Sequence, residues 1–206
     1  TSDARTGIVT YNGYNENGSV QSMTDAGNRT TAYTYDEVGR TVAVDAPDTT
    51  DKDGNAISNI TNTSYYDTGQ VKATWGDQTY SRFNVYDDLN RLVELRTYQD
   101  LAHGTEPTVA TTDFASTKWN YNSQRGWLDS KRYDDNQGPS YEYSAAGRLT
   151  KRTWARTNSD SSLLTTSYAY DQGQMVSTTY NDGLTSNVAY QYDNYGRPTQ
   201  VTQGTG

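Results

Sequence analysis

Short runs of alternating apolar and polar side chains recur along the chain, and Gly, Asn and Asp interrupt them every few residues. In a run such as Tyr33-Thr34-Tyr35 the two rings lie on one face of a strand, because successive side chains of a strand point to opposite faces. No segment carries a helical repeat of apolar residues beyond a short turn at 113–116. The pattern predicts an all-β protein of short strands and tight turns.

One motif, of the form Tyr-x-Tyr-Asp-x-x-Gly-Arg, recurs through almost the whole chain. Its complete, variant and shortened copies lie at 14–20, 33–40, 66–71, 85–92, 119–128, 141–149, 170–175 and 190–197. The Asp of the motif accepts hydrogen bonds from backbone N–H groups two residues on and so starts a turn. The Gly takes the left-handed conformation that ends a short hairpin loop, and Asn90 is the next best residue for it. The Arg then begins the return strand.

These turns are the structural sites that the sequence predicts. The residues expected to build them are Tyr35, Asp36, Gly39, Arg40, Tyr66, Asp67, Gly69, Tyr86, Asp87, Asn90, Arg91, Tyr143, Gly147, Arg148, Tyr170, Asp171, Gly173, Tyr192, Asp193, Gly196 and Arg197.

The spacing of the motif is regular. Its Asp position, or the equivalent residue, falls at 15, 36, 67, 87, 122, 144, 171 and 193, so short and long intervals alternate. The copies form four pairs, at 14–40, 66–91, 121–148 and 170–197, in one array over 1–206. Each pair also has a turn signal in its middle, such as Asn181-Asp182-Gly183. The chain is therefore predicted to be tandem antiparallel β-hairpin repeats that form a long twisted or spiralling sheet.

Three longer connections join or extend the repeats. They run from Asp45 to Ile60, from Tyr98 to Thr117 and from Arg156 to Ser162, and all are polar. We expect exposed hairpin extensions or loops there, and they are the first places to look for recognition.

The composition supports a folded chain with an aromatic, partly polar core. Ile, Leu, Val and Phe make up only roughly an eighth of the residues, a level typical of disordered chains. The chain also holds 19 Tyr and 4 Trp, however. Tyr buries a large ring, keeps a polar tip and favours strands, as Thr does.

Charge and residue types exclude several functions. The net charge is −8 and the basic residues form no run, which argues against nucleic acid as a partner. With no Cys and one His, disulfides and the usual zinc and copper sites are not expected, and neither is any cofactor. The apolar runs are too short to span a bilayer, and residues 1–5 do not begin a signal peptide.

The Tyr-x-Tyr-Asp-x-x-Gly-Arg-Leu pattern resembles the Rhs/YD repeats of bacterial polymorphic toxins, insecticidal toxin-complex proteins, wall-associated proteins and the animal teneurins. The resemblance covers the chain from about Tyr14 to Arg197. It implies a sheet that spirals into a hollow shell, which in toxin members encloses a C-terminal effector. The expected partners are the rest of a larger repeat protein and an enclosed effector. The expected location of that protein is secreted or at the cell surface.

Few residues suggest chemistry. Asp51, Asp53 and Asn55 resemble part of a calcium loop, but no distal Glu follows, so an exposed hairpin tip is the favoured interpretation. His103 lies in a loop sequence without the partners of a catalytic triad. The repeated Asp residues are spread along the array rather than converging, as a glycosidase would need. An enzyme is therefore not expected.

The tryptophans leave a second function open. Trp75, Trp119, Trp127 and Trp154, with the many tyrosines, could stack against sugar rings or peptides and make a carbohydrate- or partner-binding surface. The favoured interpretation is that they form the packed face of the sheet itself. The first hypothesis is thus a structural segment that encapsulates or displays something else, and the alternative is a binding module.

Overall fold

The computed structural model describes residues 9–204. It contains strands only, in the chain order β1(Thr10–Tyr11), β2(Ser22–Thr24), β3(Thr30–Tyr35), β4(Thr41–Thr50), β5(Ala56–Tyr65), β6(Val71–Gly76), β7(Ser81–Tyr86), β8(Leu92–Tyr98), β9(Ala115–Tyr121), β10(Leu128–Arg132), β11(Ser140–Tyr143), β12(Leu149–Thr157), β13(Leu163–Asp171), β14(Gln174–Tyr180), β15(Val188–Tyr192) and β16(Pro198–Gln203). In the described part of the chain no helix is long and apolar enough to cross a membrane.

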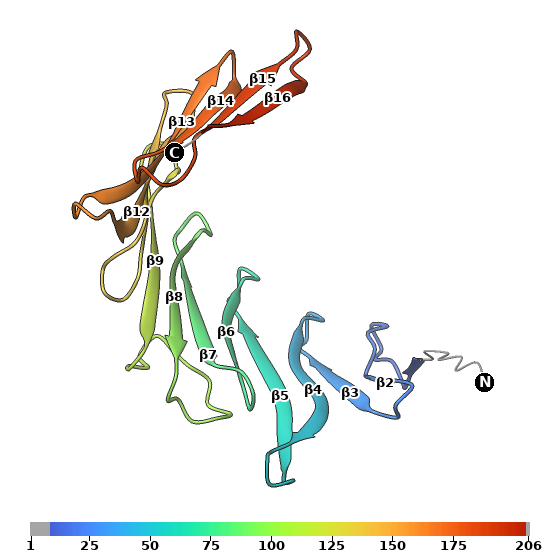
Figure 1. Ribbon diagram of the computed structural model, residues 1–206. Helices are drawn as coiled ribbons and strands as arrows, with labels where there is room; N and C mark the ends of the chain where they lie inside the picture. Colours follow the sequence, from blue (N-terminus) through green and yellow to red (C-terminus); the bar gives the residue numbers. More distant parts are fainter. Residues whose placement is uncertain (1–8, 205–206) are drawn as a thin grey trace. The chain divides into compact units, whose positions relative to one another are not determined.

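The strands form a meander in which spatial order follows sequence order, from β1 to β16 in one 16-stranded sheet. The neighbouring strands pair antiparallel, and Figure 1 lets the reader follow this through β3 to β8. The predicted all-β fold of tandem antiparallel hairpins is confirmed. The chain divides into two compact units, 1–116 and 117–206.

A register shift marks the end of most motif-bearing strands. It falls between Thr34 and Tyr35, between Ser64 and Tyr65, and between Val85 and Tyr86 in the first unit. The second unit repeats it beside Tyr143, Tyr170 and Tyr192. Such a bulge bends the strand just before the turn and re-aims the side chain there, which here is the tyrosine directly before the turn.

Because the chain meanders, every second turn lies at the same end of the strands. Within each unit all the motif turns therefore lie at one end of the strands. We call this row of turns the motif edge. The intervening turns, such as 25–29 and 51–55, lie on the opposite edge. The edge on which a turn lies thus follows from counting strands.

The first unit has a small apolar core. Ala73, Phe83 and Tyr98 are buried there, on β6, β7 and the end of β8. Leu101 and Phe114, both from the connection after β8, pack against them. The ring centroids of Tyr98 and Phe114 are 5.7 Å apart, in an edge-to-face arrangement.

The expectation of exposed connections holds in full for two of the three and in part for the third. The connections at 45–60 and 156–162 extend or cap the β4–β5 and β12–β13 hairpins. The connection from Tyr98 to Thr117 differs, because it folds back over the sheet and buries Pro107 fully. Most of its other residues are exposed, so the expectation of an exposed loop fails only for the buried Pro107 and for Leu101 and Phe114, which pack against the core.

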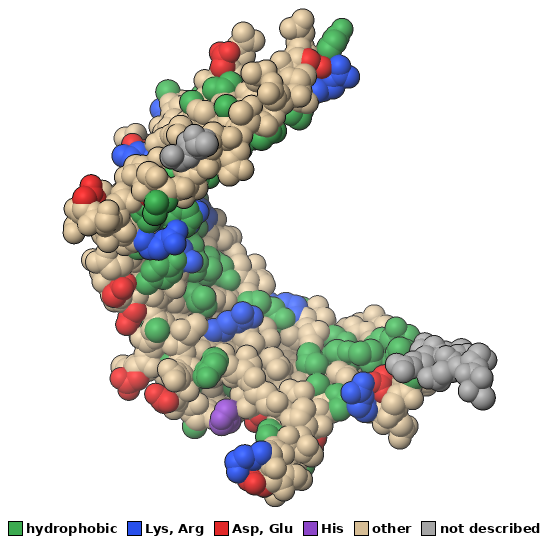
Figure 2. Space-filling view, viewed as in Figure 1, with side chains coloured by type: hydrophobic (Ala, Val, Ile, Leu, Met, Phe, Trp, Pro, Cys, Tyr) green, Lys and Arg blue, Asp and Glu red, His purple; other side chains and the backbone are tan. Residues whose placement is uncertain are grey.

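The second unit has one aromatic and one polar face. Cross-strand neighbours share a face, and the pairs Lys131↔Trp119 and Tyr141↔Arg152 place cations beside rings. On the other face Ser130 pairs with Ser140, and Ser140 with Thr153. In Figure 2 hydrophobic side chains and Lys or Arg side chains lie next to one another around β12.

Candidate functional site

The motif turn has a recurring backbone geometry. In the copy at 36–40 the Asp36 N–H donates to the Arg40 carbonyl at 2.9 Å, and the Gly39 N–H donates to the Asp36 carbonyl at 3.0 Å. Gly39 has a φ of 84°, the left-handed region that favours glycine. Asn90 takes the same place in the copy at 87–91 with a φ of 60°. Gly and Asn therefore occupy this position because of its backbone conformation.

The carboxylate of the motif Asp holds the turn closed. One oxygen of Asp87 accepts the N–H groups of Leu89 and Arg91, at 3.0 and 2.9 Å. The other accepts the Arg91 Nε–H at 2.8 Å, so Asp and Arg form a clamp across the turn. The clamps at Asp36–Arg40 and Asp193–Arg197 have the same three bonds. The Arg91 hydrogen bond lowers the pKa of the Asp87 carboxyl, so the clamp is charged at neutral pH.

The same clamp recurs in a turn at the other end of the strands, opposite the motif edge. Asp25 accepts the N–H of Gly27 and both the backbone and side chain of Arg29. Its copy of the turn has Asn28 at a φ of 59°. The device therefore belongs to the turn type and is not limited to the Tyr-x-Tyr repeats.

The calcium candidate adopts this turn as well. Asp51 accepts the N–H groups of Asp53 and Asn55 and the Asn55 side-chain amide. Asn55 thus stands where other copies have Arg, and the Asn55 amide hydrogen bond lowers the pKa of Asp51. Within residues 9–204 no three His, Cys, Asp or Glu side chains are grouped as metal ligands would be.

Two shortened copies are aligned differently from the sequence-based expectation. In the copy at 66–70 the turn starts at Tyr66, whose N–H donates to Gln70 O, so Asp67 lies one residue inside the turn. In the other, Gln172 and Gly173 both have positive φ and form a two-residue hairpin loop. Asp171 there is a strand residue paired with Gln174.

A second contact, from the tyrosine before each turn, joins successive repeats. The Tyr35 hydroxyl donates to Val20 O at 2.9 Å, and the Tyr65 hydroxyl to Thr41 O at 2.8 Å. The same link joins Tyr86 to Val71, Tyr143 to Leu128, Tyr170 to Leu149 and Tyr192 to Met175. In each case the acceptor is the residue at which the chain returns from the preceding motif turn. We call this bond the tyrosine link.

The motif Arg points the other way, toward the following repeat. The Arg40 guanidinium lies 4.5 Å from the centre of the Tyr65 ring and donates to Tyr66 O at 3.3 Å. Arg148 lies 5.8 Å from the Tyr170 ring centre. Cation–π contacts of this kind are attractive and directional. The motif edge is therefore joined by contacts that run in both directions along the array.

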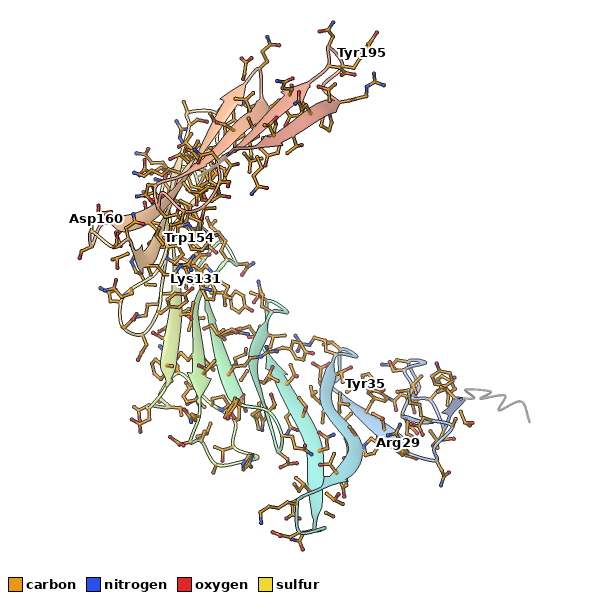
Figure 3. All side chains as sticks on the ribbon, viewed as in Figure 1. Arg29, Tyr35, Lys131, Trp154, Asp160 and Tyr195 are labelled. Atoms are coloured by element: carbon orange, nitrogen blue, oxygen red, sulfur yellow. The ribbon has the colours of Figure 1, made fainter. Side chains whose placement is uncertain are left out.

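The tryptophans are distributed rather than gathered. Trp75 packs against the core of the first unit, and Trp127 lies 5.2 Å from Tyr143. The Arg152 guanidinium is 3.5 Å from the Trp154 ring centre, and Lys131 is 5.3 Å from that of Trp119. Figure 3 shows Trp154 and Lys131 among other side chains of the sheet. Cations of the chain itself thus lie over the indoles of Trp119, Trp127 and Trp154.

Two further titratable groups in the described part of the chain, His103 and Arg96, make contacts in or beside the connection after β8. The His103 Nδ1 lies 3.4 Å from Gly76 O in the connection after β8. Arg96 pairs with Glu94 at 3.0 Å and lies 4.5 Å from the Phe114 ring centre, so this pair anchors the connection. These contacts are structural, and none forms a nucleophile–base pair.

Sequence reasoning identified the turn residues but not their links. The clamp could have been suspected from Asp and Arg four residues apart in the copies at 33–40, 85–92 and 190–197, whereas the copy at 141–149 has Ser144 in place of the Asp. The tyrosine link had a weaker signal, because its acceptor is a backbone carbonyl and any residue provides one.

Comparisons with known proteins agree with this geometry. Residues 14–56 match the model of the RHS repeat family. No curated protein matches the chain in sequence. The resemblance to the Rhs/YD repeats is confirmed by this match and by the fold.

The fold is similar to that of solved toxin-complex proteins. The crystal structure of TcdB2-TccC3-TEV matches with a TM-score of 0.55 at 10% identity, over 96% of this chain and 11% of that one. TcdB2-TccC3 without its hypervariable C-terminal region matches with a TM-score of 0.54 at 11% identity, over 95% and 11%. The Photorhabdus luminescens Tc holotoxin pore gives 0.52 at 12% identity, over 92% and 11%. The chain thus spans about a tenth of these solved chains.

Proposed function

We propose that the chain is a structural repeat segment of an Rhs/YD-type shell or cell-surface protein that encapsulates or displays an effector or adhesive region. The observation that carries the proposal is the tyrosine link, made in the same way in six repeats. A wall needs contacts that repeat identically from unit to unit. The fold shared with TcdB2-TccC3 supports the same function.

The proposal assigns no catalysis to this segment. The recurring carboxylates of Asp36, Asp87 and Asp193 are occupied in turns, where each accepts backbone N–H groups. The partners proposed are the adjoining parts of the repeat protein and its enclosed effector. The proposed location is outside the producing cell or on its surface.

Protease protection tests the enclosure. In the full protein, Gly76→Ala places a Cβ 2.2 Å from Ile60 O and so opens the β5–β6 pairing. We expect the effector region to become sensitive to protease in this variant. Gly204→Ala is the matched control, because Gly204 has no positive φ and its added Cβ would lie 3.7 Å from the nearest heavy atom, Asn187 O, an ordinary contact distance. An effector region equally sensitive in all three proteins would contradict enclosure.

Carbohydrate binding is the alternative, and the tryptophans would carry it. A glycan array with the 206-residue chain tests it directly. Reproducible binding that is lost in Trp119→Ala or Trp154→Ala would favour a binding module. Arg152 and Lys131 lie over these indoles, however, and a sugar would have to displace them.

A further inference from the structure

Three cations of the second unit lie over aromatic rings and have no carboxylate partner. The Arg152 and Arg156 guanidiniums lie 3.5 and 5.3 Å from the centre of the Trp154 ring. The Lys131 ammonium lies 5.3 Å from the centre of the Trp119 ring. Within residues 9–204 none of the three makes an ion pair. We call these three cations and two tryptophans the cationic face.

The strand register places these cations on one face of the sheet. Ser130, Ser140 and Thr153 form a cross-strand row on the polar face. Side chains alternate along a strand, so Lys131 and Arg152, each next to a member of that row, point to the other face. Only β11 lies between β10 and β12, which puts Lys131 and Arg152 about 10 Å apart across the strands.

The carboxylates around the cationic face are engaged elsewhere. Glu142 of β11 points to the polar face, where it lies 3.2 Å from Lys151. Asp135 and Asp160 each accept a backbone N–H of their own turn at 2.9 Å. Asp129 lies at the register shift at the start of β10, beside the motif turn. The face therefore carries cations whose counter-ions the described chain does not supply.

The charge of the chain is divided unevenly between its two units. Residues 1–116 hold 17 Asp and Glu against 8 Lys and Arg, whereas residues 117–206 hold 8 against 9. An acidic ligand is therefore repelled by the first unit but not by the second. The Nε of Arg152 is also buried without a hydrogen-bond partner, and a ligand carboxylate would satisfy a donor of that kind.

We propose that the cationic face binds an acidic peptide segment of a partner protein. The segment lies extended across β10 to β12, and its carboxylates accept hydrogen bonds from Lys131, Arg152 and Arg156. A guanidinium that lies over a ring keeps N–H groups at its edge, and these match the geometry of a carboxylate. The surface does not depend on enclosure of an effector, which the protease experiment above tests separately.

A peptide segment fits this face better than a small anion or a neutral sugar. A small anion cannot reach Lys131 and Arg152 together, because they lie about 10 Å apart. A neutral sugar would stack on indole faces, which the cations already cover. An extended peptide with several carboxylates meets both requirements, since it spans the strands and leaves the cations on their rings.

Fluorescence polarisation with the 206-residue chain tests the proposal. The probe is a labelled peptide of alternating Glu and Ser, and the same peptide with Gln in place of Glu is the neutral probe. We expect only the Glu peptide to bind, and its binding to weaken as salt screens the charges. Lys131→Gln and Arg156→Gln should each weaken binding about fivefold.

Arg82→Gln is the matched control variant, because it removes the same charge from an exposed position of β7, in the other unit. It should leave binding unchanged. Circular dichroism checks that each variant keeps the β-sheet spectrum. Arg156 is exposed, so if Lys131→Gln unfolds the chain, the comparison of Arg156→Gln with Arg82→Gln decides.

Several outcomes would overturn the proposal. They are a Glu peptide that does not bind, a Gln peptide that binds as well, and binding that Arg82→Gln weakens as much as Arg156→Gln does. Binding that neither Lys131→Gln nor Arg156→Gln weakens would place the peptide elsewhere on the chain. Labelled polygalacturonate is the last probe, and tighter binding of it than of the Glu peptide would assign the face to acidic saccharides instead.

Discussion

The hydroxyl of Tyr35 donates a 2.9 Å hydrogen bond to the carbonyl oxygen of Val20, fifteen residues earlier and in the preceding repeat. The bond joins the end of one outgoing strand to the return point of the previous motif turn. Tyr65 and Thr41 make the same contact one repeat later. Each repeat therefore stabilises its neighbour, as in other repeat proteins where stability resides in nearest-neighbour contacts.

Removing one tyrosine link should weaken the array measurably. Tyr65→Phe keeps the ring beneath Arg40 but removes the hydroxyl that donates to Thr41 O. We expect a loss of about 1 kcal/mol in the free energy of unfolding, the usual value of one hydrogen bond. Urea denaturation measures it. Tyr80→Phe is the control, because Tyr80 is exposed, and an equal loss there would contradict the role of the link.

Acid should weaken the Asp–Arg clamps. The folded-state pKa of Asp87 is lowered, chiefly by the side-chain hydrogen bond from Arg91. Its clamp therefore contributes stability above the unfolded-state pKa of about 3.9 and loses it as the pH falls through the folded-state value. The loss is measured as a fall in the melting temperature between about pH 7 and 3.

Asp87→Asn should make the melting temperature less sensitive to acid than in the wild type. Asp88→Asn alters the neighbouring, exposed carboxyl of the same turn and serves as the control. If both variants respond to acid as the wild type does, the clamp is not a source of pH-dependent stability.

The need for a positive φ in the turn can be tested with a substitution that makes no new packing contact. Gly69 has a φ of 94°, and an added Cβ meets no heavy atom within 4 Å. Gly69→Ala should therefore cost about 1 to 2 kcal/mol through backbone strain alone. Asn90→Gly, at a φ of 60°, should be neutral or slightly stabilising. Thermal unfolding distinguishes these results, and a neutral Gly69→Ala would contradict them.

The connection after β8 should be essential to the first unit. Phe114→Ala removes a ring that packs on Tyr98 and lies beside Arg96, so we expect a loss of about 2 to 3 kcal/mol. Val109→Ala, in the same connection but 70% exposed, should change little. Hydrogen exchange should show the loss in β6 to β8, and protection that is unchanged there would argue against a structural cover.

Much of the fold could be predicted, because it depends on local chemistry. Alternation of apolar and polar residues predicts strands, and Gly39 and Asn90 mark turns that need a positive φ. The antiparallel meander then follows from the shortness of the connections. The candidate site was predicted only in part, since Asp67 and Asp171 do not occupy the turn position that Asp36 does.

The sequence by itself determined the strands, the turn chemistry and the family resemblance, because each depends on residues close together in the chain. Only the tertiary structure decided which groups of different repeats meet. The acceptor Thr41 O is a backbone atom with no residue preference, so nothing in the chain marks it as the partner of Tyr65. The fold of the connection over Phe83 and Tyr98 was equally hidden, because a polar segment with a few apolar residues covers a core only where the sheet brings that core beneath it.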